Sequence, residues 1–185
     1  MSFCLWITGL PGSGKSAITS ELEKLLAESG VEAITLALDR IRKVITPDPR
    51  YTDQERELVY RSLVMMAKLL VEHSGKGVII DATGNRRRFR DLARHLIPEF
   101  AEVYVSCPLE VCQERETSRQ SREVQADLYR KAKQGRLEGG LPGVSSPYEE
   151  PESPEVRVES DMLTPRESAR RILGYIKSRW PLYSE

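Results

Sequence analysis

The segment GLPGSGKS, residues 9–16, constrains the fold of this chain more than any other feature of its sequence. It fits the pattern G-x-x-x-x-G-K-[ST] at every fixed position. An apolar run at residues 3–8 precedes it, and residues 15–29 follow with apolar side chains at helical spacing. A strand, a glycine-rich loop and a helix in this order predict a phosphate-binding loop rather than an ordinary turn that happens to precede Lys-Ser.

The loop also predicts individual roles for its residues. Backbone N–H groups and the helix dipole gather around phosphate oxygens in such a loop. Lys15 is expected to reach the β and γ phosphates of a nucleoside triphosphate, and the Ser16 hydroxyl is expected to bind Mg²⁺. The residues expected to surround the phosphates are Gly9, Gly12, Ser13, Gly14, Lys15, Ser16 and Ala17.

Length and composition narrow the class of protein. The 185 residues predict one domain, residues 1–185. The 28 basic and 28 acidic side chains cancel, which argues against nucleic acid or an acidic membrane as a partner. Cys4, Cys107 and Cys112 form no C-x-x-C pair, which favours a reduced, cytoplasmic protein. No signal peptide is expected, and no apolar stretch is long enough to predict a membrane span.

Strand-like and helical runs alternate along the chain, which predicts an α/β fold with a parallel sheet covered by helices on both faces. The expected strands are 3–8, 33–38, 77–81, 103–106 and 156–158. The expected helices are 15–29, 40–46, 52–73, 86–96, 109–119, 124–134 and 165–179. Thr52 with Glu55 and Thr164 with Glu167 predict capping boxes at two helix starts.

Residues 113–155 differ in amino-acid composition from the rest of the chain. They are polar and charged, then rich in Gly, Pro and Ser, without an apolar strand. Such a segment in a compact domain is either disordered or functional. Beside a phosphate-binding loop it predicts a lid that closes over the triphosphate, with Arg115 among the cations that could reach the phosphates.

Two aspartates end predicted strands, and ligands of open parallel sheets bind beyond the carboxyl ends of the strands. Asp81 is expected to hold Mg²⁺ directly or through water. Asp39 is expected to take or orient the proton of an acceptor hydroxyl. The alternative for each is a helix N-cap, because a helix is expected after both.

The helix expected from residue 86 opens with a cluster of cations at Arg86, Arg87, Arg88 and Arg90. The helix dipole disfavours positive charge at that end. Two interpretations stay open: a solvated basic face, or a surface that binds an anionic acceptor.

Four blocks of the sequence together resemble the adenylylsulfate (APS) kinase family, whose members phosphorylate the 3′-hydroxyl of APS. These blocks are residues 7–16, 38–42, 102–115 and 128–155. The resemblance implies a P-loop NTPase fold with strand order 2-3-1-4-5 plus the lid segment 113–155. It also implies ATP and Mg²⁺ as cofactors, a small anionic substrate and a homodimer.

The resemblance also assigns residues to the acceptor. Asp39 and Arg42 match the family's D-G-D-N-[IV]-R, and Arg56 and Arg61 match arginines of its D-R-x-E-N-I-R-R helix. The acceptor set implied in this way is Asp39, Arg42, Tyr51, Arg56, Arg61, Lys131 and Leu141, with Tyr51 and Leu141 at the family's two adenine-clamping positions. Thr83, from a segment that departs from the family pattern, is also expected to bind the acceptor.

The chain diverges from the family pattern on the acceptor side. Ala37 replaces the first aspartate of D-G-D, Val59 replaces the asparagine of N-I-R-R, and Leu141 replaces a stacking phenylalanine. Residues 81–86 are closer to the D-A-T-x-x segments of other hydroxyl kinases.

The function expected is transfer of the ATP γ-phosphoryl group to the 3′-hydroxyl of APS. The alternatives are another hydroxyl acceptor (a nucleoside, a nucleic-acid 5′-end or an aminoacyl-tRNA) and a nucleotide-binding regulator that has no acceptor.

Overall fold

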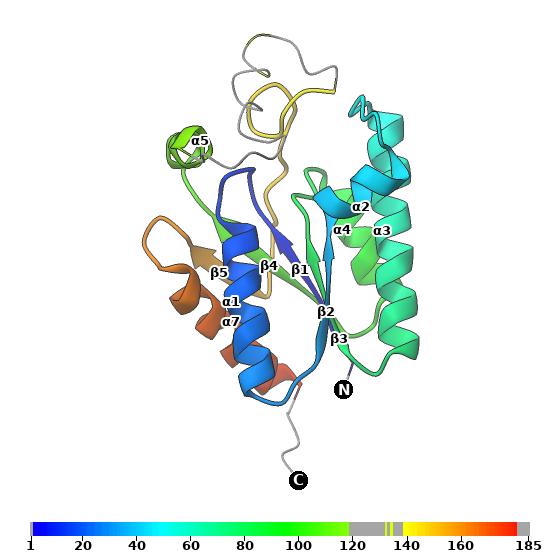
Figure 1. Ribbon diagram of the computed structural model, residues 1–185, viewed down its shortest axis with the longest axis vertical. Coiled ribbons are helices and arrows are strands. Elements are labelled where there is room, and N and C mark those ends of the chain that lie inside the picture. The colour runs from blue at the N-terminus through cyan, green and yellow to red at the C-terminus, as the bar shows by residue number, and fades with distance from the viewer. Residues whose placement is uncertain (1, 119–131, 133, 135–138, 181–185) are drawn as a thin grey trace.

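The computed structural model describes residues 2–118, 132, 134 and 139–180. A five-stranded sheet in the order β2-β3-β1-β4-β5 lies between two layers of helices (Figure 1). Each strand pairs in parallel with its neighbours. The predicted α/β fold and the strand order are therefore confirmed.

The observed elements follow the predicted ones closely. The strands are β1 (Cys4–Thr8), β2 (Ala33–Ala37), β3 (Gly77–Asp81), β4 (Phe100–Ser106) and β5 (Val156–Glu159). The helices are α1 (Lys15–Glu28), α2 (Leu38–Ile45), α3 (Asp53–His73), α4 (Arg87–Leu96), α5 (Leu109–Ser118) and α7 (Pro165–Arg179). The expected helix 124–134 lies outside the described residues apart from 132 and 134.

Two boundaries differ from the expectation by more than one residue. Strand β4 begins at Phe100, because Cys4 to Thr8 of β1 pair with residues 100–104 along their whole length. Helix α2 begins at Leu38, directly after β2, so that no loop separates the strand from the helix.

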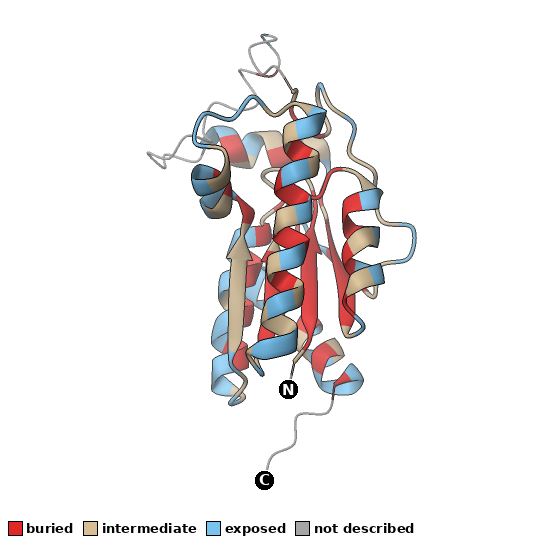
Figure 2. Ribbon diagram, turned by 90° about the vertical axis from the view of Figure 1, so that its right-hand side faces the viewer, coloured by how far each residue is buried: buried red, intermediate tan, exposed pale blue. Residues whose placement is uncertain are grey.

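The central strand β1 is buried on both faces, which explains its uninterrupted apolar run (Figure 2). Leu5 and Ile7 face a core cluster with α1 and α7, and Cys4 and Trp6 face a second cluster with α3 and α4. The three cysteines are buried free thiols. Within the described residues, no helix has the length and apolarity needed to cross a bilayer.

Only one of the two predicted capping boxes is complete. The Thr164 side chain accepts from Glu167 N–H while Glu167 accepts from Thr164 N–H, and Pro165 occupies the first turn. Thr52 accepts from Glu55 N–H at 3.2 Å, but the Glu55 carboxylate is engaged by other groups. It accepts from Arg50 N–H, Tyr51 N–H and Arg42. The Glu55 carboxylate thus binds the residues that precede α3 and does not accept a hydrogen bond from the Thr52 backbone, as a capping box would require.

Three arginines of the cluster, Arg86, Arg87 and Arg90, fit neither interpretation drawn from the sequence, because they contact the segment 149–155. Arg88 is exposed and pairs with Glu57 of α3. Arg86 pairs with Glu149 at 2.9 Å, and Arg87 pairs with Glu152. Arg90 is 1% exposed, pairs with the buried Glu102, and donates to the carbonyl of Glu149 at 2.7 Å. These contacts offset the unfavourable helix dipole and attach the end of the lid segment to the body of the protein.

The buried Arg90–Glu102 pair should be essential for stability. We expect Arg90→Leu to lower the free energy of unfolding by about 3–5 kcal/mol, because it leaves the Glu102 carboxylate buried with only the more distant Arg94 as a partner. Urea denaturation followed by circular dichroism measures this. Arg88→Leu is the matched control, since Arg88 is exposed and pairs with Glu57 at the surface. Equal losses of unfolding free energy in Arg90→Leu and Arg88→Leu would contradict the stabilising role assigned to the buried pair.

Candidate functional site

The glycine-rich loop, residues 9–16, joins β1 to α1 and packs against α5. Gly12 has φ 79°, and a Cβ at this position would lie 2.4 Å from the Cys112 carbonyl oxygen. Only glycine combines this backbone conformation with so close an approach. Ser160, just after β5, donates from its hydroxyl to Ser13 O at 2.7 Å and supports the loop from another side.

Lys15 lies in the centre of this loop with 9% of its surface exposed. Its ammonium group donates to Gly9 O at 3.0 Å and to Leu10 O at 2.9 Å. Burial lowers the pKa of Lys15, whereas the carboxylates of Asp81 and Asp39 act to raise it. The lysine and the two aspartates predicted at strand ends therefore share one electrostatic environment.

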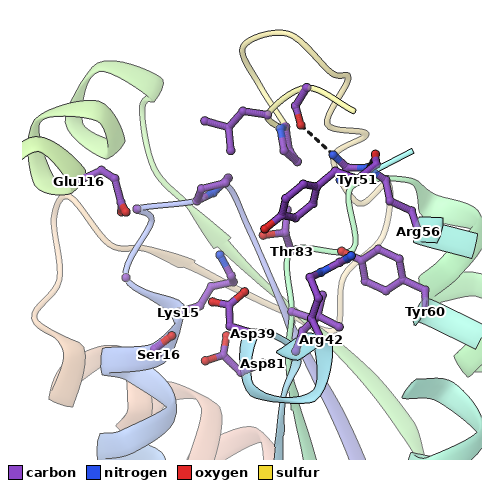
Figure 3. Close-up of a pocket in the computed structure, with 18 of the residues that line it drawn as sticks. Lys15, Ser16, Asp39, Arg42, Tyr51, Arg56, Tyr60, Asp81, Thr83 and Glu116 are labelled. Atoms are coloured by element: carbon purple, nitrogen blue, oxygen red, sulfur yellow. Dashed lines mark hydrogen bonds between the residues drawn. The ribbon is translucent and has the colours of Figure 1, made fainter. Parts of the chain in front are cut away.

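A cavity of about 230 Å³ opens above this loop at the carboxyl ends of the strands (Figure 3). Its wall brings together most of the site residues predicted from the sequence. Those lining it are Gly12, Gly14, Lys15, Ser16, Asp39, Arg42, Tyr51, Arg56, Asp81, Thr83, Arg115 and Leu141.

The two aspartates reach the cavity by different routes. Asp81 is the last residue of β3 and is in register with Ile7 on one side and Ala37 on the other. Asp39 lies in the first turn of α2, where the helix follows β2 without a loop. The N-caps of α2 and α4 are Ala37 and Arg86, so neither aspartate has the capping role that was the alternative.

Arg42 and Tyr51 form one part of the wall. Arg42 is 7% exposed and pairs with Glu55 at 2.8 Å, and its guanidinium lies 5.0 Å from the centroid of the Tyr51 ring. Tyr51 has φ 60°, rare for a residue with a side chain, and its backbone N–H donates to Glu55. The Tyr51 ring is thus fixed beside a cation, where a flat ligand could stack on it.

Arg56 connects this wall to the described end of the lid segment. It donates to Tyr51 O at 2.9 Å, to Gly139 O at 3.0 Å and to Gly140 O at 2.8 Å. A Cβ at residue 139 would lie 1.6 Å from Tyr51 O, so the two backbones touch here. Leu141 follows directly and is 4% exposed.

Arg115 is part of α5 and is held against the loop. Its guanidinium donates to Ser160 Oγ at 3.1 Å and Ser160 O at 2.6 Å. It also lies 3.8 Å from the position of a Cβ at Gly14. Arg115 is therefore already beside the loop that is expected to hold the phosphates.

The structure does not bring every predicted residue to the cavity. Arg61 points outward with 63% of its side chain exposed and pairs with Glu57. Ala17 is exposed on α1, Gly9 and Ser13 are buried within the loop, and Lys131 lies outside the described residues. The roles assigned to Arg61 and Lys131 stay predictions.

Several wall residues were not among the predicted site residues, and they include Leu38, Tyr60 and Glu116. Tyr60 stands four residues after Arg56, one helical turn further along the same face of α3, and this spacing could have marked it. Glu116 is 3% exposed and contributes to the electrostatic environment of Lys15.

The fold, the loop and the two cavity aspartates define a nucleotide-binding protein of the P-loop class, and the adenylyl-sulfate kinases among its relatives make it an ATP-dependent kinase. The comparisons with known proteins narrow this class. The family model described as adenylylsulphate kinase matches residues 1–159. This chain belongs to the adenylylsulphate kinase family.

Individual relatives agree with this assignment. The chain is 38% identical over 175 residues to the "Probable adenylyl-sulfate kinase" of Pyrococcus abyssi, covering 95% of each sequence. It is 34% identical to the "Adenylyl-sulfate kinase" of Halothermothrix orenii, covering 95% of this chain and 89% of the relative. Its structure matches Mycobacterium tuberculosis APS kinase CysC in complex with AMPPNP and APS, with TM-score 0.83, 30% identity and coverage of 95% and 98%.

The close packing at Gly12 generates a prediction about nucleotide binding. Gly12→Ala should weaken ATP binding by at least about tenfold, because the added methyl group must displace α5 or distort the loop. Isothermal titration with a non-hydrolysable ATP analogue measures the effect.

Gly30→Ala is the matched control for this variant. Gly30 also has a positive φ, 71°, but no heavy atom lies within 4 Å of the point that a Cβ would occupy, and the residue lies at the far end of α1. Unchanged ATP affinity in Gly12→Ala would mean that the loop tolerates a side chain at this contact.

Proposed function

We propose that this protein transfers the γ-phosphoryl group of ATP to the 3′-hydroxyl of APS, releasing ADP and 3′-phosphoadenylylsulfate. The observation that carries the proposal is the environment of Arg56. This side chain is 4% exposed, lines the cavity, and donates only to neutral backbone carbonyls. Among the described residues, no carboxylate forms an ion pair with it. A buried cation on the wall with no ion-pair partner among the described residues favours an anionic ligand such as APS.

The relatives support APS as the acceptor. The Mycobacterium tuberculosis structure, with TM-score 0.83, is named as a complex with APS and the ATP analogue AMPPNP. The residues matched to the family's acceptor motifs, among them Asp39 and Arg42, lie on the same cavity wall as Arg56.

Each residue has a distinct part in the proposed reaction. The loop N–H groups, Lys15 and Arg115 bind the phosphates and balance the charge that develops during transfer. Asp39 accepts the proton of the 3′-hydroxyl as its oxygen attacks the γ-phosphorus and ADP leaves. Arg42 and Arg56 hold the anionic part of the acceptor, and Tyr51, Thr83 and Leu141 complete the wall that positions it.

The residues present also fit Mg²⁺. The Ser16 hydroxyl and the Asp81 carboxylate both line the cavity, and hard oxygen ligands of this kind suit the ion. Among the described residues, no three His, Cys, Asp or Glu side chains gather as a metal site, so phosphate oxygens and water would supply the remaining ligands. When bound, Mg²⁺ would neutralise charge on the phosphate oxygens.

A homodimer and a location in the cytoplasm remain proposals. The first rests on the family resemblance, and the second on the three free thiols.

The direct test is ADP release by the purified protein with Mg-ATP, with and without APS, beside a panel of nucleosides and RNA 5′-ends. We expect APS to accelerate release, with the new phosphate on the 3′-oxygen of the product by NMR. Acceleration by another member of the panel and not by APS would replace the proposed acceptor. Slow release that no acceptor changes would favour a nucleotide-binding regulator.

Asp39→Asn tests the proposed base. Turnover should fall about 10²–10⁴-fold because the amide cannot accept the hydroxyl proton, while ATP affinity stays within about twofold. Steady-state kinetics and ATP titration measure the two quantities. Asp53→Asn, at the start of α3, is a control that should leave turnover unchanged. Near-normal turnover of Asp39→Asn would remove Asp39 from this role.

A further inference from the structure

Tyr60 is a tyrosine fixed by aromatic packing at the wall of the cavity. It is 2% exposed, its ring stacks on Phe89 with centroids 4.4 Å apart, and it also stacks on Trp6 at 6.0 Å. Both partners belong to the core cluster under α3 and α4. The position of the phenol is therefore set before any ligand enters.

The hydroxyl group of Tyr60 has a hydrogen left to donate. Its oxygen accepts from Gly84 N–H at 3.0 Å, and no other described residue bonds to it. A phenol carries one donor as well as its acceptor sites, so the hydroxyl hydrogen remains available. Figure 3 shows the Tyr60 ring pointing from α3 into the cavity, toward Arg42 and Thr83.

The surroundings of this hydroxyl belong to the acceptor side. The charges of Arg42, Arg56 and Asp39 all act on it. Burial, the largest effect, raises the pKa of Tyr60 above its ordinary value, so the phenol is protonated at neutral pH and can donate. A donor on which two guanidinium charges act suits an oxygen that carries negative charge.

The neighbouring residue cannot take this role. Val59, which stands where the family motif has asparagine, is 0% exposed and packs in the core cluster. The polar group that α3 presents to the cavity one turn after Arg56 is therefore the Tyr60 hydroxyl.

We infer that Tyr60 is a substrate-binding residue whose hydroxyl donates a hydrogen bond to an anionic oxygen of the acceptor. This inference rests on the proposed function, since the acceptor considered is APS. Tyr60 stands where the family motif D-R-x-E-N-I-R-R has isoleucine, so the proposed acceptor contact comes from a side chain that the motif does not contain.

Tyr60→Phe tests the inference because it removes the hydroxyl and keeps the ring. We expect kcat/KM for APS to fall about tenfold or more, the effect of losing one hydrogen bond to a charged group, while KM for ATP stays unchanged. Tyr60→Met, a flexible side chain of similar reach without a hydroxyl, repeats the test should Phe destabilise the fold.

Tyr148→Phe is the matched control. The Tyr148 hydroxyl lies 3.1 Å from Thr8 Oγ1, and Tyr148 does not line the described cavity. Both Phe variants lose one internal hydrogen bond, so both should lower the melting temperature. Only Tyr60→Phe should lower kcat/KM for APS. All assays are run well below the lowest melting temperature.

The outcomes separate this inference from the proposed function. APS-dependent turnover in the wild type together with unchanged APS kinetics in Tyr60→Phe would overturn the inference alone. Equal loss of ATP and APS affinity in Tyr60→Phe would also overturn it, because that pattern indicates a structural role. Absence of APS-dependent turnover in the wild type would overturn the proposed function and the inference with it.

Discussion

The site depends on the pairing of β1 with both β3 and β4 at the centre of the sheet. Because β1 is buried on both faces, the loop that leaves its carboxyl end has a fixed starting point. The same pairing sets the register that brings Asp81 level with Ile7, two residues before the loop begins. The nucleotide side is thus built on a strand that is buried on both faces and paired on both edges, as accurate positioning of phosphates requires.

The acceptor side is assembled by polar contacts between segments that are distant in sequence. Arg56 binds the carbonyls of Gly139 and Gly140, and Arg90 binds the carbonyl of Glu149. Each arginine of this kind satisfies buried backbone oxygens that would otherwise lack a partner. The cost of burying these cations is offset by several hydrogen bonds at once, and these bonds hold the described part of the segment 139–155 against the body of the protein, with Gly140, Leu141 and Pro142 in the cavity wall.

The divergence from the family motifs is concentrated on this acceptor side. Leu141 supplies an apolar surface where the motif has an aromatic ring, and Tyr51 supplies a ring beside Arg42. Ala37 ends β2 and caps α2 by its backbone alone. The loop, Lys15 and Ser16 keep the full family pattern. The nucleotide-binding motif is therefore retained, while positions matched to the family's acceptor motifs carry other side chains.

The amino-acid sequence by itself determined the alternation of strands and helices, the phosphate-binding loop and the strand-end position of Asp81. These features depend on local spacing: an apolar strand, a glycine-rich loop at a helix start and a carboxylate at a strand end are all readable within a few residues. Tertiary structure alone decided which cations face the cavity. Arg61 and Arg56 lie on one helix, yet Arg61 points outward and Arg56 inward. Arg86 and Arg87 pair with acids about 60 residues later in the chain. Glu55 binds Arg42 instead of completing its cap. A long charged side chain takes the partner that the fold brings within reach, and sequence spacing does not encode that partner.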